Sequence, residues 1–367
     1  MKHTPFHENH IKANATMGPV GEWLAPMVYS SAVDEHEATR NRVTTTDFST
    51  MCKFMIQGKD ARAFSQYLLV NDVEKLYPGK AFYSAMCDDA GCFVDDITLY
   101  MLEENSYMLI GGIPAREKDA AWLNQHAAGF DVCFSDVTSA FGILSVAGPL
   151  SRDLFQKICG SCVRELSFFE FCRTSIGGHS CFLSRTGVTG ELGFEVIANT
   201  EDCFDIYETI YEAGEEYGIQ PCGMAASGTL RMEKGYISGR EFLGGRNPYE
   251  MGLGWSVALN TDFIGCAALK NVHENGLKNK LCALRIINKA IVVPAQASVF
   301  SEGKKIGTVT STAWLPTLDI SYAMAILDSK YSELGTSVSV ELGDQSLVKA
   351  EIVEKNLYDP SGSRIKA

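Results

Sequence analysis

The chain has 367 residues, 46% of them hydrophobic, which is long for a single core and predicts two or three folded units. Its formal net charge is −13, and its 32 Lys and Arg are not clustered as nucleic-acid binding requires. No apolar run approaches the roughly 20 residues of a membrane-spanning helix, and the polar first ten residues predict a cytoplasmic protein.

Residues 51–140 have the pattern of one α+β unit. Two helices are expected, one through Leu68 and one from Pro114, a residue suited to a first helical position, to about Ala127. Strands are expected around them at 51–57, 81–87, 93–102, 106–111 and 130–134. This order predicts a split β-α-β unit, in which helices cover one sheet.

A second unit of similar kind follows, and after it the helical periodicity stops. Its helices are expected at 149–158 and from Thr200 to Glu216, with strands at 142–147, 180–185 and 193–198. From about residue 280, turns rich in Gly, Ser and Asp separate short strands at 281–287, 297–300, 306–312, 320–327, 336–341 and 347–354. These strands predict a small antiparallel barrel or sandwich.

The strand that starts at Asp95 carries a polar face. Because side chains alternate along a strand, Asp96, Thr98 and Tyr100 share one face, and Asp95 lies on the other with apolar residues. A carboxylate on such a face can orient an attacking amine or stabilise developing positive charge. The alternative is an acidic turn before a strand, where Asp is common.

A second carboxylate, Glu195, lies in an apolar strand between Phe194 and Val196. An ionised side chain there is costly unless donors match it, so a bound ligand with paired N–H groups is one natural partner. The alternative is a structural Glu that backbone amides or an Arg satisfy. The nearby glycines lack the Lys-Ser/Thr ending of a phosphate-binding loop and predict tight turns instead.

Cysteine and histidine placement argues against a metal site. Most of the 12 cysteines lie in apolar segments, where a free thiol behaves as a small hydrophobe. The one compact pair, Cys159 and Cys162, has no second close pair to complete a zinc site. The 7 histidines form no local ligand set, so no metal is predicted.

Several motifs occur in the order typical of one family. They are the turn 91–96, the segment 116–119, the stretch Thr186-Gly-Val-Thr-Gly-Glu-Leu-Gly-Phe-Glu195, the run from Leu230 to Gly235 and the segment from Asn247 to Trp255. With these motifs the chain resembles, nearly end to end, the glycine-cleavage T-protein family of tetrahydrofolate-dependent aminomethyltransferases and their demethylase relatives.

The resemblance implies an α+β fold, a cloverleaf of three subdomains around a central folate channel. Two would be ferredoxin-like α+β units and the third a C-terminal antiparallel β-barrel. The division it implies is residues 1–50 plus 141–262 for the folate-binding α+β subdomain, 51–140 for a second α+β subdomain that carries Asp96, and 263–367 for the barrel.

The resemblance also implies residue roles. Asp96 matches the family's catalytic aspartate, which lies close to the reactive nitrogens of tetrahydrofolate. Glu195 matches the acidic residue that accepts the pterin's N–H groups, a bidentate bond worth about 1.5–3 kcal/mol when buried. The other residues expected beside the cofactor are Tyr83, Tyr100, Met51, Thr98, Arg231, Gly112 and Ser227. For the aromatic residues and Met51, core packing is the alternative.

The chain departs from the family pattern at four places near this site. Ser227-Gly228 replaces Arg-Asp, Gly112 replaces Asn, Thr50 replaces His, and Pro294 or Ala295 lies where an Arg is usual. Lost volume and charge favour a wider or less charged channel, which suits a different one-carbon donor.

Three functions follow from these observations. The first is aminomethyl transfer from the lipoyl arm of a carrier H-protein, which releases ammonia and leaves methylenetetrahydrofolate. The second is a folate-dependent demethylase or methyltransferase that acts on a small methylated amine, sulfonium or ether. The third is a non-catalytic folate-binding assembly or repair factor, against which the retained Asp96 and Glu195 argue. A monomer or weak dimer is expected.

Overall fold

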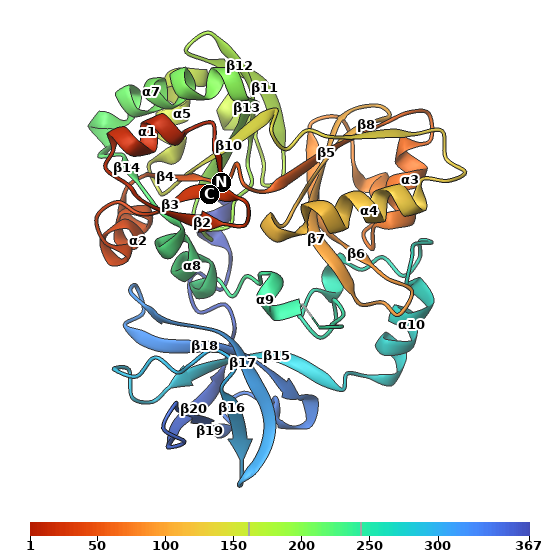
Figure 1. The fold of residues 1–367 in the computed structure, drawn as a ribbon, viewed down its shortest axis with the longest axis vertical. Coiled ribbons are helices and arrows are strands. Elements are labelled where there is room, and N and C mark those ends of the chain that lie inside the picture. Colours follow the sequence, from red (N-terminus) through yellow and green to blue (C-terminus); the bar gives the residue numbers. More distant parts are fainter. Residues whose placement is uncertain (161, 243) are drawn as a thin grey trace.

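The structure is a computed structural model that describes residues 1–160, 162–242 and 244–367. Three lobes surround a central region that contains the short helix α9 (Gly239–Phe242) (Figure 1). The mixed α+β character and the closed C-terminal barrel confirm the predicted fold class. None of the helices in the described parts of the chain has the length and apolar character needed to cross a membrane.

The first lobe, at the upper left of Figure 1, is built on a six-stranded sheet. Its strand order is β11 (Phe171–Ile176), β12 (His179–Ser184), β13 (Gly193–Asn199), β10 (Phe141–Ala147), β4 (Thr44–Asp47) and β14 (Gln220–Pro221). Helices α5 (Ser151–Cys159) and α7 (Cys203–Gly214) pack on it. Strand β4 lies between β10 and β14 and pairs with both. The N-terminal part of the chain therefore supplies one strand to a sheet whose other strands lie about 100 residues or more further along the sequence.

The remaining elements of this lobe lie beside this sheet. A small sheet has the order β1 (Lys2–His3), β3 (Trp23–Val28) and β2 (Thr16–Val20). The helices here are α1 (His7–Lys12), α2 (Ala32–Asn41), α6 (Cys162–Glu165) and α8 (Met224–Glu233). Ser31 caps α2, because its hydroxyl accepts the Asp34 N–H.

The second lobe is a five-stranded antiparallel sheet with helices α3 (Ala61–Leu68) and α4 (Arg116–His126). Its strand order is β6 (Lys80–Cys87), β7 (Phe93–Glu103), β8 (Ser106–Gly111), β5 (Cys52–Gln57) and β9 (Cys133–Asp136). The apolar face of β7 is buried in the lobe's core by Ile97, Leu99 and Met101. The opposite face of β7 therefore points out of the core, as its alternation predicted.

Several strands differ from the sequence predictions, and β1, β2, β3, β4 and β14 lie where no strand was predicted. The strand expected at 130–134 begins instead at Cys133, because Asp131 bonds with Asp60 at the start of α3 rather than with β5. Strand β11, at Phe171–Ile176, was not predicted; exposed and partly exposed side chains alternate along it because it is the edge strand of its sheet.

The third lobe is a closed barrel, which decides between the barrel and sandwich alternatives. Its strands, in barrel order, are β15 (Asn279–Ile286), β18 (Ile320–Asp328), β17 (Lys304–Leu315), β16 (Ser298–Ser301), β19 (Ser337–Glu341) and β20 (Leu347–Val353). Helix α10 (Cys266–Asn275) precedes the barrel and packs beside β6 through Cys266 and Leu269. The last helix is α11 (Ser363–Lys366).

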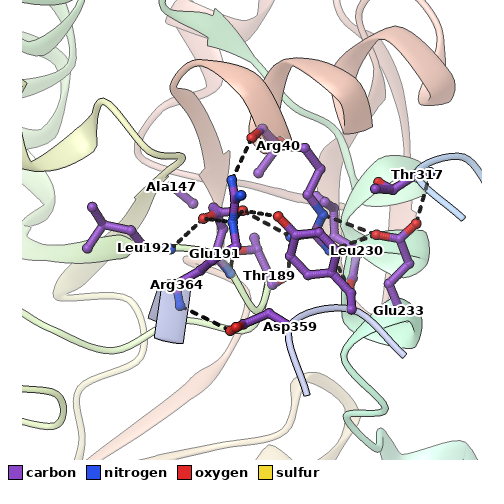
Figure 2. Close-up of polar contacts among 12 residues, drawn as sticks. Arg40, Ala147, Thr189, Glu191, Leu192, Leu230, Glu233, Thr317, Asp359 and Arg364 are labelled. Carbon is purple, nitrogen blue, oxygen red and sulfur yellow. Dashed lines mark hydrogen bonds and ion pairs between the residues drawn. The ribbon is translucent and has the colours of Figure 1, made fainter. Parts of the chain in front are cut away.

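A buried charge cluster joins the first lobe to the barrel (Figure 2). Glu233 on α8 accepts two hydrogen bonds from the Arg40 guanidinium of α2, at 3.1 and 3.0 Å. Its other oxygen accepts the Thr317 N–H from the β17–β18 loop at 3.0 Å, and His36 lies 3.0 Å away. Glu233 and His36 are fully buried, so three segments distant in sequence meet at one carboxylate.

The C-terminal segment is attached to the same cluster. Arg364 donates to both oxygens of Glu191 at 3.0 Å, and also to the Arg40 carbonyl (Figure 2). The Tyr358 hydroxyl donates to Glu191 at 2.6 Å, while the Arg40 guanidinium lies 3.7 Å from the centre of its ring. The chain that leaves the barrel is therefore held against the first lobe.

We predict that Glu233→Ala strongly destabilises the protein. The substitution removes both hydrogen bonds from Arg40 to Glu233 and leaves its buried charge with only Glu191, 3.8 Å away, which costs about 3–5 kcal/mol of unfolding free energy. Urea denaturation measures the loss. Asp319→Ala, which removes the exposed ion pair with Lys289, is the control and should leave the midpoint nearly unchanged. Similar midpoints for the two variants would contradict the role given to the cluster.

Candidate active site

The candidate site lies on the polar face of β7. The Tyr83 hydroxyl, from the paired strand β6, donates to Asp96 Oδ2 at 3.0 Å. Both side chains, and Thr98 between them, keep part of their surface accessible. Tyr83 lies directly opposite Thr98 in the β6–β7 register, so the strand pairing itself brings these three predicted residues together.

The surroundings of Asp96 favour its neutral form. Burial raises the pKa of this carboxyl to about 7, the neighbouring Asp95 carboxylate adds to the rise, and the Tyr83 hydrogen bond opposes it. A group with this pKa exists in both protonation states near neutral pH. Such a group is able to accept or donate a proton, which is what acid–base chemistry requires.

Glu195 lies at the other end of the same face. Thr186 donates to Glu195 Oε2, and the Tyr100 hydroxyl lies 3.5 Å from the same oxygen. Tyr100 and Glu195 are 2% and 8% exposed, so this end of the site is nearly closed to solvent. Asp96 and Tyr100 are four residues apart on one strand, roughly 13 Å along its axis.

Part of the Glu195 carboxylate remains available. Both of its side-chain hydrogen bonds, from Thr186 and Tyr100, reach Oε2, and Oε1 accepts none from the described residues. Burial raises the pKa of Glu195, while those two hydroxyls oppose the rise. A carboxylate oxygen that keeps accessible surface and has no protein donor is suited to accept an N–H group of a ligand.

Arg231, on α8, provides the positive charge on this side of the molecule. Its guanidinium donates to the Tyr236 carbonyl at 2.7 Å and to the Ser311 hydroxyl at 3.2 Å, and it lies 3.5 Å from Glu241. Burial lowers the pKa of Arg231, and the carboxylates of Glu241 and Asp96 oppose that shift. Arg231 and Asp96 are therefore close enough for their charges to interact.

Glu241 is a member of this site that the sequence did not indicate. It is 1% exposed, accepts hydrogen bonds from Thr310 and Ser311 of β17, and raises the pKa of Asp96. No local pattern could have identified it, because Ser311 lies 70 residues away in sequence. The site thus contains charges from β7, α8 and α9.

The other predicted residues have different surroundings. Met51 packs with Tyr100 in the apolar cluster between the two sheets. The Gly112 N–H donates to Asp95 at 2.7 Å, so this glycine contacts the acid on the opposite face from Asp96. Ser227 is buried in α8, where its N–H donates to Gly223, and the structure gives it no contact with the other predicted residues.

The positions of three departures are also defined. Thr50 is 1% exposed, and its hydroxyl has no partner among the described residues. A Cβ at Gly228 would meet no atom within 4 Å, so space is open there. Pro294 is exposed on the segment before β16. None of the three positions carries a charge.

An exposed aromatic residue adjoins the site. Trp255 is 68% exposed, and its ring centre lies 5.9 Å from that of Tyr83. A single exposed aromatic side chain is common on protein surfaces, so its position beside Tyr83 is the feature that matters here.

The described residues contain neither a disulfide nor a group of side chains arranged as a metal site. All 12 cysteines there are free thiols, Cys159 and Cys162 included. Within the same residues, no group of three or more His, Cys, Asp or Glu side chains is arranged to hold a metal ion.

We predict that Tyr83→Phe raises the pKa of Asp96 above about 7, because the lost hydroxyl stabilised the carboxylate form. Titration of side-chain carboxyl carbons by NMR measures the change. The control is Tyr107→Phe on the adjacent strand β8, whose hydroxyl has no partner among the described residues. An Asp96 titration unaltered by Tyr83→Phe would show that the hydrogen bond has no influence on the carboxyl.

Comparison with known proteins identifies the family. Residues 6–261 match the family described as "GCVT N-terminal domain", and residues 279–359 match the family described as "Glycine cleavage T-protein C-terminal barrel domain". The chain is 36% identical over 362 residues to the aminomethyltransferase of Caldanaerobacter subterraneus, covering 98% of this chain and 96% of that protein. It is 37% identical over 363 residues to that of Bacillus subtilis, covering 98% and 99%.

A solved structure agrees with these relatives. The glycine cleavage system aminomethyltransferase T from Bartonella henselae superposes with a TM-score of 0.90 at 26% identity, covering 98% of both chains. The match extends over all three lobes, and the predicted family is confirmed. The chain belongs to the glycine-cleavage T-protein family of aminomethyltransferases.

Proposed function

We propose that the protein is a tetrahydrofolate-dependent aminomethyltransferase whose site is the polar face of β7 together with Glu195. It takes the aminomethyl group from a lipoyl carrier, releases ammonia and leaves methylenetetrahydrofolate. The single observation that carries the proposal is that one strand face holds a titratable carboxyl, Asp96, at one end and meets a buried, partly unsatisfied carboxylate, Glu195, at the other. Family membership supplies the reaction class.

The residues at this face fit tetrahydrofolate. Glu195 Oε1 is available to accept N–H donors of the pterin ring, and Tyr100 and Thr186 fix the carboxylate that does so. Met51 supplies apolar surface beside Tyr100. Tetrahydrofolate, when bound, supplies the nitrogens that accept the one-carbon unit. We propose Tyr83, Thr98, Arg231, Gly112 and Ser227 as further residues beside it.

Asp96 is proposed as the catalytic residue. Its pKa of about 7 allows it to hold a proton or give one up at neutral pH. As a carboxylate it stabilises positive charge that develops on the one-carbon unit as the unit leaves sulfur. Tyr83 fixes the orientation of this carboxylate with its hydrogen bond, and Arg231 and Glu241 set the charge around it.

The partner proposed for this site is the lipoyl carrier H-protein. Trp255, exposed beside Tyr83, offers a surface on which a carrier could place its arm near Asp96. The second candidate is transfer from a small methylated amine, sulfonium or ether. A monomer or weak dimer and a cytoplasmic location remain predictions, as does the division into residues 1–50 with 141–262, 51–140 and 263–367.

We predict that tetrahydrofolate stabilises the protein and that Glu195→Gln loses most of this effect. A ligand that binds only the folded state adds about 2.7 kcal/mol at 100 times its dissociation constant. Gln replaces one acceptor oxygen by a donor that faces the pterin's donors. Melting temperature with and without ligand measures the difference. A wild-type melting temperature that saturating tetrahydrofolate leaves unchanged would remove the basis of the proposal.

We predict that Asp96→Asn folds normally but transfers the one-carbon unit at least 100-fold more slowly, about the contribution of one acid–base group. The assay supplies tetrahydrofolate with either an aminomethyl-lipoyl carrier or a panel of methylated amines, sulfoniums and aryl ethers. Methylenetetrahydrofolate and ammonia from the carrier support the proposal. Methyltetrahydrofolate from a small donor, with no reaction of the carrier, would replace it by the demethylase.

A further inference from the structure

Two buried carboxyl groups meet on the opposite face of β7 from the candidate site. Asp95 on β7 and Asp119 on α4 are 3% and 0% exposed. A Cβ added at Gly111 would lie 2.9 Å from Asp95 Oδ2 and 2.8 Å from Asp119 Oδ2. The two side chains therefore converge on one point above Gly111, where only a glycine leaves room for both.

One of these two groups must be neutral. When two buried carboxyl groups converge on one point, the charge of one disfavours ionisation of the other. Burial, and after it the Asp95 charge, raise the pKa of Asp119 to about 9. Asp119 Oδ1 has no partner among the described residues, and an unpaired oxygen is far less costly on a neutral acid than on a carboxylate.

Asp95 is the partner that holds the negative charge. It accepts the Gly112 N–H at 2.7 Å, and its Oδ2 converges with that of Asp119 on the Cβ position of Gly111. Burial raises its pKa, while the Gly112 N–H, the Lys118 charge and the Asp119 hydrogen bond oppose the rise. The pair therefore carries one proton and one negative charge at neutral pH.

The other groups that face the pair and Asp96 are few. Cys52 on β5 lies 3.5 Å from Asp119 Oδ2, and Lys118 on α4 donates to the Val94 carbonyl near both acids. Asp96 itself is faced by Tyr83 from β6, Arg231 from α8, Glu241 from α9 and Asp95 from its own strand. Asp95 is thus a charge that acts on Asp96 and that converges with a second ionisable group, Asp119, at Gly111.

We propose that Asp119 is a positioning residue, which keeps a proton between itself and Asp95, holds Asp95 against the Gly112 N–H, and thereby sets the charge that Asp96 experiences. The inference deepens the proposed function, because it assigns a protonation state behind the proposed catalytic residue. It also gives a reason for two consecutive glycines at the end of β8. A Cβ at Gly112 would lie 3.2 Å from Asp95 Oδ1, closer than most such contacts.

The protonation state is tested without folate or activity. Asp119 keeps its proton in the folded state to about pH 9, but the unfolded chain loses it above about pH 4. The stability it contributes is full below pH 4 and is lost as the pH rises toward 9. Asp119→Asn lacks this dependence. The ratio of its folding equilibrium constant to that of wild type should therefore rise, by at most about tenfold per pH unit, between pH 5 and 8.

Urea denaturation of both proteins at several pH values gives this ratio. A ratio that stays constant or falls between pH 5 and 8 would overturn the inference, because Asp119 would then be ionised in the folded protein. Leu123→Ala, one turn further along α4 and also fully buried, is the matched control. Its folding constant relative to wild type should not change with pH.

The link to Asp96 is tested by the pH profile of transfer. Asp119→Leu deprives Asp95 of its hydrogen-bond donor, so Asp95 becomes neutral at a higher pH and repels Asp96 less. The acid limb of kcat/KM should move about one pH unit lower. Asp119→Asn retains a neutral donor, so its acid limb should stay in place. An unmoved limb in Asp119→Leu, or equal shifts in both variants, would contradict the positioning role.

If Asp119→Leu does not fold, or the protein proves inactive in transfer, the denaturation experiment still decides the protonation state.

Discussion

The interaction on which the rest of the structure depends is the buried contact between Glu233 and Arg40. Glu233 accepts from α2 through Arg40 and from the barrel through the Thr317 N–H, so one carboxylate fixes two lobes relative to each other. Removing Glu233 would leave the buried Arg40 charge with only Glu191, 3.8 Å away, which is far more costly than losing a surface pair. The arrangement of the lobes therefore depends on buried charges that have their partners, and not on apolar contact alone.

This arrangement places the groups of the site together. Glu233 and Arg231 lie on the same helix, α8, and Arg231 donates to Ser311 of the barrel. Asp96 comes from the second lobe and Glu195 from the first, and the apolar cluster around Tyr100 fills the space between their sheets. Each lobe therefore supplies a part of the site, and none contains all of it.

The features that could be predicted from the sequence are those with local causes. Alternation along β7 placed Asp96, Thr98 and Tyr100 on one face, and regular turns after residue 280 indicated the barrel strands. What could not be predicted depends on distant partners. Glu241 joins the site through the hydrogen bond that it accepts from Ser311, 70 residues away in sequence. The Asp95 carboxyl meets Asp119 only because α4 packs on β7. Edge strand β11 has too many polar residues to give a strand pattern.

The central claim is that Glu195 and Asp96 mark the two ends of one folate site. A crystal structure of the protein with bound tetrahydrofolate tests it most directly. The pterin N–H groups should lie within hydrogen-bond distance of the Glu195 carboxylate, while the nitrogens that accept the one-carbon unit should lie beside Asp96. Tetrahydrofolate bound away from β7, or bound in the reverse orientation, would contradict it.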